Sequence, residues 1–298
     1  MIIFISDGRL GNQIFQYSFL KTISKKDEII VFLNMEMFFK TFDVDRHGIW
    51  HITNKYIGFF LKNIIVPLML TPLYKTRIIN LLEQKKDIHL RPLPDWSETR
   101  GLLPFIRYVK TDFFQSEIFF DKTLVSDLKI KDTYMENARQ IISGISENYT
   151  KVFIHIRRGD YINKSFKGDI GIDLPKSYYE NAINIIKEEI ETPIFIFLSD
   201  DPSYVKCCFK GFEPKIILKN SSEVDFGIMT LCEAGIISNS SYSWWGAYLM
   251  NTKKKVISPK YWYGWKQKVE SHIGIQPTFS EVIDFTDPTN DESDYQTS

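Results

Sequence analysis

The sequence contains few cysteines: Cys207, Cys208 and Cys232 are the only ones among its 298 residues. They form no Cys-x-x-Cys pair and no cysteine–histidine spacing of the kind that indicates a zinc site. An odd number of cysteines is typical of proteins from reducing compartments. We therefore expect three small buried thiols in a cytoplasmic protein.

An excess of charge of either sign is also missing. Lysine and arginine total 37 residues and aspartate and glutamate total 37, so the formal net charge is zero. A broad nucleic-acid-binding surface normally requires a strongly basic excess, so no nucleic-acid partner is expected. The balance leaves room for a local basic pocket.

Long uninterrupted apolar runs are absent as well. Residues 1–6 have neither a basic region nor a small-residue cleavage site, so no signal peptide is expected. The most hydrophobic segment, residues 57–73, contains Lys62, Asn63 and two prolines, which leaves its apolar runs too short to span a bilayer. It predicts a core or interdomain helix. The alternative is a surface that touches membrane lipid or a lipid-linked substrate.

Short apolar runs do occur, and they alternate with helical patterns. This alternation predicts an α/β fold with parallel, doubly wound sheets and right-handed crossovers. The predicted strands cover residues 2–6, 28–33, 105–110, 152–156, 194–198, 215–218, 235–238 and 253–258.

Two Rossmann-like domains are expected, residues 1–150 and 151–285. Residues 286–298 are almost without apolar side chains and predict a disordered tail. Residues 34–104 are rich in aromatic and basic side chains and interrupted by prolines, and they give no clear order of elements.

The central predicted strand, residues 152–156, includes His155 and is followed directly by Arg157, Arg158 and Asp160. Ligands in open α/β sheets collect beyond the carboxyl ends of the strands. Two adjacent guanidinium groups there suit a phosphate, because each offers a planar fork of N–H donors. A surface salt-bridge corner remains the alternative.

Three other polar clusters lie at predicted strand ends or helix starts. Residues 8–13 follow the first strand, but their glycines do not fit the dinucleotide pattern G-x-G-x-x-G. Residues 239–243 supply four hydroxyl or amide side chains, more than one helix cap needs, which favours hydrogen bonds to phosphate or sugar oxygens. Asp200 and Asp201 could bind a metal ion or cap the next helix, and Asp225 alone reads as an ordinary exposed acid.

Four sequence blocks together resemble the bacterial α-1,2-fucosyltransferases of glycosyltransferase family 11. They occur in the order of that family over about residues 1–265: Gly8-Arg9-Leu10-Gly11-Asn12-Gln13, Phe114-Gln115-Ser116-Glu117, His155-Ile156-Arg157-Arg158-Gly159-Asp160 and Ser238-Asn239-Ser240-Ser241-Tyr242-Ser243-Trp244-Trp245-Gly246-Ala247.

The resemblance implies a GT-B-type fold, with two Rossmann-like domains whose parallel sheets face each other across a cleft. The N-terminal domain would face the acceptor and the C-terminal domain would bind the GDP-sugar. It further implies an inverting transfer of L-fucose from GDP-β-L-fucose to the 2-hydroxyl of a terminal β-galactoside, in O-antigen or capsule synthesis. Neither a metal nor another cofactor would be required.

The resemblance also implies roles for individual residues. Arg157 would contact the diphosphate, supported by His155 and Arg158, while Asp160 would hold the loop. Asp225 would read the guanine base, and Asp200 falls in a second family motif with a less defined role. Thus the catalytic residues are predicted to be Arg157, His155 and Asn12, and the donor-binding residues Gly11, Arg158, Asp200, Asp225, Asn239, Ser240, Ser241 and Ser243.

The expected partners are GDP-L-fucose and a galactose-terminated oligosaccharide, either free or linked to a lipid. The protein would then be cytoplasmic, with a peripheral position on the inner face of the cytoplasmic membrane. Residues 34–104 match nothing in the family's pattern, so the acceptor stays open, as do the general base and the oligomeric state.

Two alternatives remain. A metal-dependent GT-A-type transferase with a single Rossmann-like domain would use Asp43-Val44-Asp45 or Asp200-Asp201. The other is a non-catalytic protein that binds a nucleotide or a glycan.

Overall fold

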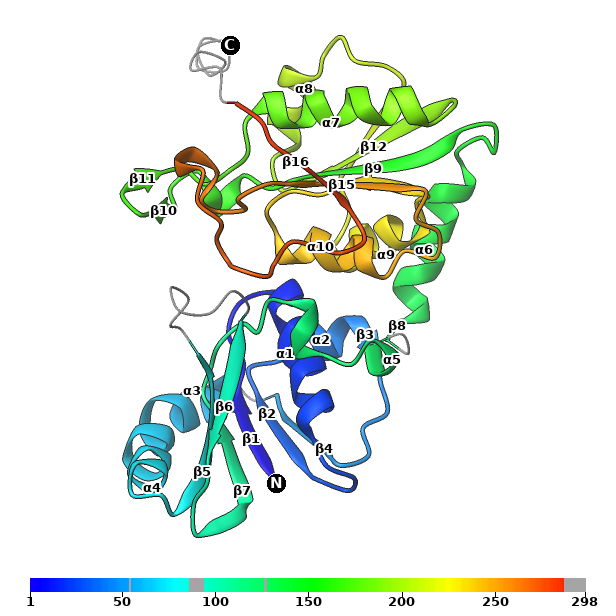
Figure 1. The fold of residues 1–298 in the computed structure, drawn as a ribbon. Coiled ribbons are helices and arrows are strands. Elements are labelled where there is room, and N and C mark those ends of the chain that lie inside the picture. The colour runs from blue at the N-terminus through cyan, green and yellow to red at the C-terminus, as the bar shows by residue number, and fades with distance from the viewer. Residues whose placement is uncertain (54, 86–93, 126–127, 287–298) are drawn as a thin grey trace. The chain divides into compact units, whose positions relative to one another are not determined.

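The computed structural model describes residues 1–53, 55–85, 94–125 and 128–286 (Figure 1). The predicted tail, residues 286–298, therefore lies outside the described residues except for Thr286. The chain forms two compact units, Met1–Lys129 and Ile130–Ser298.

The sequence predicts the boundary between the units at residue 150, but in the structure it falls between Lys129 and Ile130. Helix α6 (Asp132–Ser143) belongs to the second unit because it packs against α9 (Ser222–Leu231). Ala138, which is fully buried, faces Gly227, where an added Cβ would lie 3.1 Å from the Ala138 Cβ. The two small residues let the helices approach closely.

The first unit is built on a six-stranded sheet in the order β4-β2-β1-β7-β5-β6. All neighbouring strands are parallel except β5 and β6, which pair antiparallel at one edge. The strands are β1 (Ile2–Ile5), β2 (Ile30–Leu33), β4 (Ile49–Ile52), β5 (Ile79–Lys85), β6 (Asp95–Thr99) and β7 (Leu103–Val109); two-residue strands are β3 (Phe42–Asp43) and β8 (Lys129–Ile130).

Helix α1 (Leu10–Ile23) supplies much of the core of this unit. Its aromatic side chains stack on rings from distant segments: Phe19 lies 4.0 Å from Phe114 and Tyr17 lies 4.1 Å from Phe38, between ring centroids. These contacts hold α1 in place, and its first turn carries Asn12. The other helices are α2 (Glu36–Thr41), α3 (Lys55–Phe60), the π-helix η1 (Leu61–Leu70), α4 (Thr71–Lys75), the 3₁₀ turn η2 (Glu117–Phe119) and α5 (Lys122–Val125).

The apolar segment at residues 57–73 is not a core helix, so this part of the prediction is wrong. α3, η1 and α4 follow one another without a break, and Gly58 is the only buried residue among residues 56–75. Within the described part of the chain, Tyr56–Lys75 is the one helix that is long and apolar enough to cross a membrane. A periodic apolar pattern gives helical structure but does not tell what covers the helix.

The second unit is built on a six-stranded sheet that is parallel throughout, in the order β13-β12-β9-β14-β15-β16. Counted along the chain this order is 3-2-1-4-5-6, that of Rossmann-type nucleotide-binding folds. The strands are β9 (Thr150–Ile156), β12 (Pro193–Ser199), β13 (Lys215–Leu218), β14 (Ala234–Ile236), β15 (Lys255–Pro259) and β16 (Glu281–Ile283).

Helices cover both faces of this sheet (Figure 1). α7 (Lys176–Glu189) and α8 (Pro202–Cys208) lie on one face, and α6, α9 and α10 (Ser241–Tyr248) lie on the other. A short hairpin, β10 (Ser165–Phe166) and β11 (Asp169–Ile170), extends from the loop after β9, and two 3₁₀ turns complete the unit, η3 (Gly159–Tyr161) and η4 (Trp265–Gln267).

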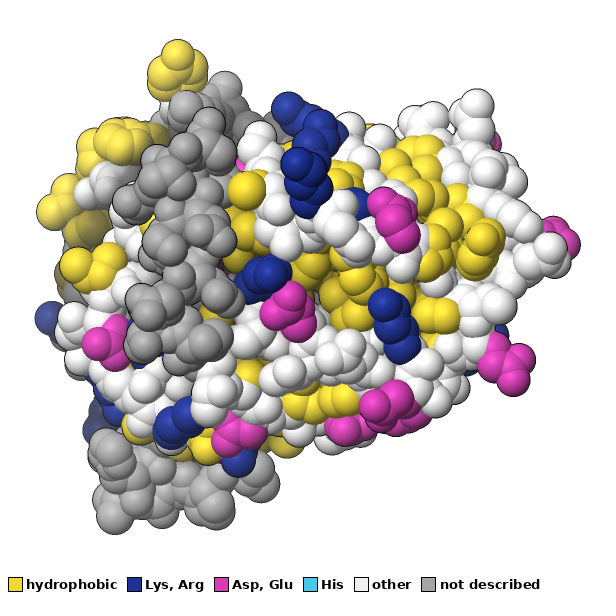
Figure 2. Space-filling model, turned by 90° about the horizontal axis from the view of Figure 1, so that it is seen from above, with side chains coloured by type: hydrophobic (Ala, Val, Ile, Leu, Met, Phe, Trp, Pro, Cys, Tyr) yellow, Lys and Arg dark blue, Asp and Glu magenta, His cyan; other side chains and the backbone are white. Residues whose placement is uncertain are grey.

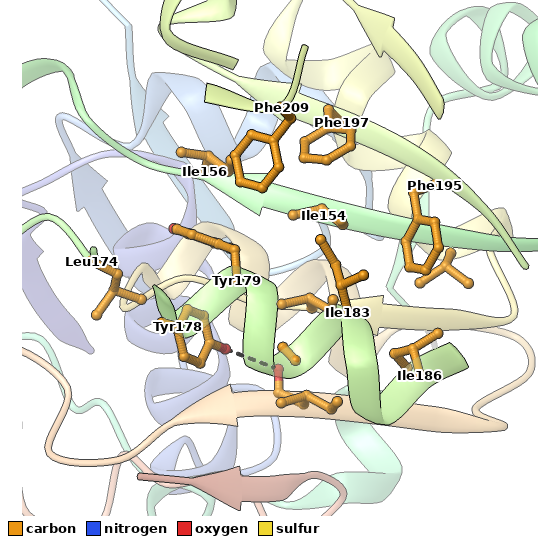
Figure 3. Close-up of a cluster of buried hydrophobic side chains, with 14 of the residues drawn as sticks. Ile154, Ile156, Leu174, Tyr178, Tyr179, Ile183, Ile186, Phe195, Phe197 and Phe209 are labelled. Carbon is orange, nitrogen blue, oxygen red and sulfur yellow. Dashed lines mark hydrogen bonds between the residues drawn. The ribbon is translucent and has the colours of Figure 1, made fainter. Parts of the chain in front are cut away.

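The main core of the second unit lies between α7 and the sheet. Figure 3 shows side chains of α7, among them Tyr178 and Ile183, packed against side chains of the strands, among them Ile154 and Phe197. The Tyr178 hydroxyl donates a hydrogen bond of 2.6 Å to the Ile237 carbonyl oxygen, just after β14. The core therefore holds the end of β14 in place.

The three cysteines differ in exposure. Cys232 is buried, as predicted, but Cys207 is exposed and Cys208 is half-buried. The short helix α8 turns Tyr204 and Val205 into the core and leaves Cys207 outside.

The prediction of two Rossmann-like units is confirmed. A GT-A-type enzyme with a single Rossmann-like domain is excluded, because each unit has its own largely parallel six-stranded sheet. On the face that Figure 2 shows, basic and acidic side chains are interspersed, in line with the balanced charge.

Candidate functional site

The strand order of the second unit marks one place for a ligand. β9 and β14 are neighbours at the centre of the sheet, and the chain winds outward from them in opposite directions. A crevice opens beyond the carboxyl ends of two such strands, where open α/β sheets bind their ligands. His155 lies at the end of β9, and residues 157–161 and 237–243 follow the two strands, so the structure brings two of the predicted clusters together.

His155 links the two clusters. Its Nδ1 atom lies 2.8 Å from the Ser238 hydroxyl, which in turn lies 3.4 Å from the Ser243 hydroxyl. Burial, together with the nearby Arg157 guanidinium, lowers the pKa of His155 to about 3. The imidazole is therefore neutral at physiological pH, which suits positioning of the loop ends and not proton donation.

The depressed pKa of His155 makes stability depend on pH. The unfolded histidine has a pKa near 6.5 and the folded one about 3, so the unfolded state binds more protons between these values and stability falls as pH falls through this window. We expect a slope of up to about 1.4 kcal/mol per pH unit. Urea unfolding over this pH range measures it: the stability difference between wild type and His155→Asn should be flat above about pH 6.5 and shrink below it.

The exposed His47 offers a matched control. His47→Asn replaces a surface side chain and should leave the free energy of unfolding within about 0.5 kcal/mol of the wild type at neutral pH. Parallel curves for wild type and His155→Asn would contradict the assignment.

Arg157 carries a guanidinium held by two carboxylates. Its Nη1 atom lies 2.7 Å from Asp200 Oδ2, and its Nη2 atom pairs with Asp160 three residues ahead. The ring of Tyr161 lies 5.3 Å from the guanidinium carbon, and 15% of the side chain remains exposed. The salt-bridge alternative is thus correct as a description of the contacts, and these contacts fix the orientation of a cation that still reaches solvent.

Arg158 has a different environment. Its Nη1 atom lies 3.0 Å from Asp173 Oδ2, its Nε atom 3.5 Å from Asp201, and its guanidinium carbon 3.8 Å from the Tyr204 ring centroid. The residue is 8% exposed. Arg158 therefore connects the loop after β9 to α8 and is buried by the protein itself, in keeping with a supporting role.

The two adjacent aspartates, Asp200 and Asp201, also have different partners. Asp200 accepts from the backbone N–H of Arg158 at 2.9 Å in addition to its pair with Arg157. Asp201 caps α8 by accepting from the Tyr204 N–H at 3.0 Å, as one of the two interpretations predicted. Within the described ranges no group of three or more histidine, cysteine or acidic side chains is close enough to hold a metal ion.

The cluster at residues 239–243 contains both capping and buried groups. Ser240 is the N-cap of α10 and accepts from the Tyr242 N–H, as expected for one member of the cluster. Asn239 and Ser243 are fully buried; the Asn239 amide donates to the Ile172 carbonyl oxygen at 2.6 Å. Ser240 and the half-buried Ser241 are nearer to solvent, so they are the better placed to bind a ligand.

Asp225 lies in the first turn of α9 and is half-buried, not an ordinary exposed acid. Burial raises the pKa of its carboxyl, although the Asn220 amide donates to it at 2.9 Å. Tyr242 packs between the rings of Phe226 and His155, at centroid distances of 5.4 and 5.3 Å. Asp225 is therefore next to the residues that bridge β9 and β14.

In the first unit, Gly11 and Asn12 lie at the corresponding place. They begin α1 after β1, and the sheet order reverses between β1 and β7. The Gln115 amide donates to Asn12 Oδ1 at 2.7 Å. Gly8 has φ of +82°, and a Cβ there would lie 2.3 Å from Asn12 Nδ2, so the turn leaves room for this side chain only with glycine.

Sequence reasoning missed several residues of these sites: Gln115, Tyr161, Asp173, Tyr204 and Tyr242. Gln115 was part of a recognised block but had no predicted contact. Tyr242 was likewise part of a recognised block. The contacts of the tyrosines could not be predicted, since they join segments far apart in the chain: the Tyr161 and Tyr263 hydroxyls, for example, lie 2.9 Å apart.

Comparison with known proteins gives concordant results. Residues 1–273 match the family model described as glycosyl transferase family 11. The O-antigen biosynthesis glycosyltransferase WbnK of Escherichia coli is 37% identical over 130 residues, 42% of this chain and 43% of that protein. The alpha-1,2-colitosyltransferase of Escherichia coli is 25% identical over 270 residues, 86% of this chain and 90% of that protein.

Solved structures are similar in fold. POFUT1 in complex with GDP has a TM-score of 0.51 at 14% identity and covers 86% of this chain and 97% of its own. The fucosyltransferase NodZ from Bradyrhizobium has a TM-score of 0.50 at 9% identity and covers 84% and 93%. At such low identity the likeness concerns the fold alone, and it confirms the predicted GT-B-type class.

Proposed function

The chain belongs to glycosyl transferase family 11, and on this premise we propose that it moves L-fucose from GDP-β-L-fucose to the 2-hydroxyl of a terminal β-galactoside. The transfer inverts the anomeric centre, needs no metal ion, and serves bacterial surface glycan synthesis such as O-antigen. The names of relatives, which include an O-antigen glycosyltransferase and galactoside alpha-(1,2)-fucosyltransferases, support this substrate class.

The observation that carries the proposal is Arg157 at the carboxyl end of β9. Negative charge grows on the departing GDP while the sugar becomes oxocarbenium-like. A guanidinium already fixed by Asp160 and Asp200 stabilises charge that develops only in the transition state, without reorganising when the bond breaks. The C1–O bond to the phosphate breaks, the acceptor oxygen forms the new bond at C1, and its proton is released.

The other residues take roles that follow from their burial. Ser240 and Ser241 donate hydrogen bonds to the phosphates or the ribose, and Asp200 holds Arg157. Asn239, Ser243, His155 and Arg158 keep the loop ends in place from positions with little or no exposure. Gly11 and Asn12 follow the central strand β1 of the first unit, the place where a ligand of that unit would bind.

The acceptor is a galactose-terminated oligosaccharide, and the protein works in the cytoplasm at the inner face of the cytoplasmic membrane. This part of the proposal includes an acceptor carried on a lipid. The proposed reaction would then take place at the membrane that carries the acceptor.

Release of GDP from GDP-fucose in the presence of EDTA tests the reaction. Lactose, Galβ1-3GlcNAc and Galβ1-3GalNAc are the acceptors to compare, with the new linkage read by NMR. Turnover of at least one galactoside to an α-1,2 product is expected. Abolition by the chelator would contradict metal independence, and tight GDP binding in calorimetry without any transfer would favour the non-catalytic alternative.

A second donor is favoured by one relative. The alpha-1,2-colitosyltransferase matches 86% of this chain, and colitose is L-fucose without one ring hydroxyl. A site that hydrogen-bonds this hydroxyl rejects the deoxy sugar strongly, whereas an apolar site discriminates only weakly. The ratio of kcat/KM for GDP-fucose to that for GDP-colitose decides which sugar the site is built for.

Asp225 provides a test of nucleotide recognition. A carboxylate can accept from N1–H and the amino group of guanine, so Asp225→Asn should raise the KM for GDP-fucose by about tenfold or more, with kcat nearly unchanged. Initial rates over a range of donor concentrations measure this. Glu188→Gln, which removes an exposed acid from α7, serves as the matched control. A fall in kcat at unchanged KM would contradict the role.

A further inference from the structure

The helix formed by residues 56–75 exposes apolar side chains on an otherwise ordinary α/β unit. Tyr56 is 85% exposed, Phe59 68% and Leu68 70%. Other large apolar side chains on the same helix are also exposed: Ile57, Phe60, Ile64 and Met69. A helix that is apolar all round is normally buried in a core or in lipid, and large exposed apolar surfaces mark interaction sites.

The exposed surface continues beyond the helix. The backbone N–H of Leu102 bonds to the Arg77 carbonyl oxygen at 2.9 Å, and that of Leu103 bonds to the Ile78 carbonyl oxygen at 2.7 Å. Leu102 is 80% exposed. The start of β7 therefore adds apolar area next to the end of the helix. We call the helix and these two leucines the apolar surface.

The charged side chains along the helix are all of one sign. No aspartate or glutamate occurs between Asp45 and Glu83, whereas Lys62, Lys75 and Arg77 are exposed on or beside the helix. The chain as a whole has equal numbers of acidic and basic residues, so the lack of acidic residues is particular to this segment. Apolar side chains flanked by lysine and arginine are what binds a bilayer that carries anionic lipid.

We propose that the apolar surface lies on the anionic face of a phospholipid bilayer, with Phe59 and Leu68 inserted among the lipids and Lys62, Lys75 and Arg77 at the phosphates. A second copy of the chain fits the surface less well. A two-fold symmetric contact would set the same basic side chains of both copies against each other.

The helix touches the bilayer and does not cross it. β4 ends three residues before α3 and β5 begins shortly after α4, and both strands belong to the same sheet. The two ends of the helix are therefore tied to one side of any membrane. Figure 1 shows α3 and α4 beside the β5–β6 side of this unit.

The proposal deepens the function and in one respect depends on it. If the protein transfers fucose to a galactoside, we infer that the acceptor is carried on a lipid. An enzyme bound to a bilayer and a lipid-linked acceptor diffuse on the same surface, which favours their encounter. Binding to the bilayer itself does not depend on the identity of the sugar.

Flotation of the full chain with vesicles tests the contact. Vesicles of phosphatidylcholine alone are compared with vesicles that also contain phosphatidylglycerol, at low and high salt. The wild type should float with the anionic vesicles, and high salt should weaken binding. The variant Phe59→Ser/Leu68→Ser should bind at least about tenfold more weakly, since each side chain loses its apolar transfer. The variant Lys62→Glu/Lys75→Glu/Arg77→Glu should lose about as much.

A matched control replaces two exposed apolar side chains elsewhere in the same unit. Ile118 and Leu124 are 52% and 45% exposed, and Ile118→Ser/Leu124→Ser should bind vesicles like the wild type. Equal binding by Phe59→Ser/Leu68→Ser and wild type, or no binding by the wild type, would overturn the proposal. The proposal would also be overturned if sedimentation showed a dimer for the wild type and a monomer for Phe59→Ser/Leu68→Ser, because a second copy would then cover the surface.

Activity separates this proposal from the proposed function. Phe59→Ser/Leu68→Ser should lower kcat/KM at least about tenfold for a galactolipid in vesicles and leave it unchanged for a soluble galactoside. An equal loss on both acceptors would place the helix in the catalytic machinery and overturn the surface role. If wild type turns over neither acceptor, the transferase proposal fails while flotation still decides the bilayer contact.

Discussion

Replacing Arg157 with alanine is expected to lower kcat/KM for fucose transfer by about 10³-fold, the effect of removing one fixed charge-stabilising group from a transition state. The loss should appear in kcat, because Arg157 would act on charge that develops as the sugar leaves. Rates of GDP release at saturating acceptor measure it. The fold should persist, since Asp200 keeps its hydrogen bond from the Arg158 backbone.

Three variants sharpen this prediction. Arg157→Lys retains the charge but not the planar fork, so we expect an intermediate loss of about 10- to 100-fold. Lys164→Ala removes an exposed cation from the same loop and should change kcat only slightly. Arg158→Ala should instead reduce the free energy of unfolding by about 3 kcal/mol, because it leaves Asp173 and Asp201 without their buried partner. Retention of more than a tenth of the activity by Arg157→Ala would contradict the proposed role.

The second large effect concerns Gly235 on β14. Gly235 pairs with Phe153 of β9 at the centre of the parallel sheet, and the fully buried Phe153 ring lies over it. A Cβ at position 235 would lie 2.2 Å from the Phe153 Cε1 atom. Gly235→Ala should therefore destabilise the protein by about 3 kcal/mol, as measured by urea unfolding.

The cause can be isolated with a second substitution. Phe153→Leu removes the ring that the new methyl group meets, so the double variant Gly235→Ala/Phe153→Leu should be more stable than the sum of the single effects predicts. Gly211→Ala is the matched control, because a Cβ there meets nothing within 4 Å. Strict additivity would show that the contact with Phe153 is not the reason for the loss.

Much of the fold could be predicted from the sequence where strands are buried on both faces. The apolar runs at residues 152–156 and 194–198 became β9 and β12. Such runs are read reliably because helices cover both faces of the sheet. The elements within residues 34–104 could not be predicted in this way. Strands β5 and β6 in this region pair antiparallel at the edge of the sheet, and their residues are only partly buried.

The strand ends at which the candidate site lies could be predicted from the sequence, but the partners of its side chains could not. Strand ends can be found from apolar runs, which is why Arg157 and Ser240 were identified. Which arginine faces solvent depends on partners such as Asp173 and Tyr204, which are distant in sequence. The burial of Asn239 and the exposure of the helix at residues 56–75 likewise depend on the whole fold.

The two carboxylates at Arg157 have a consequence for the end of the catalytic cycle. Asp160 and Asp200 stay paired with Arg157, so two negative charges lie beside the position proposed for the diphosphate and repel it. This repulsion weakens the binding of the product and speeds GDP release. A variant such as Asp160→Asn should consequently be inhibited by GDP at lower concentrations than the wild type.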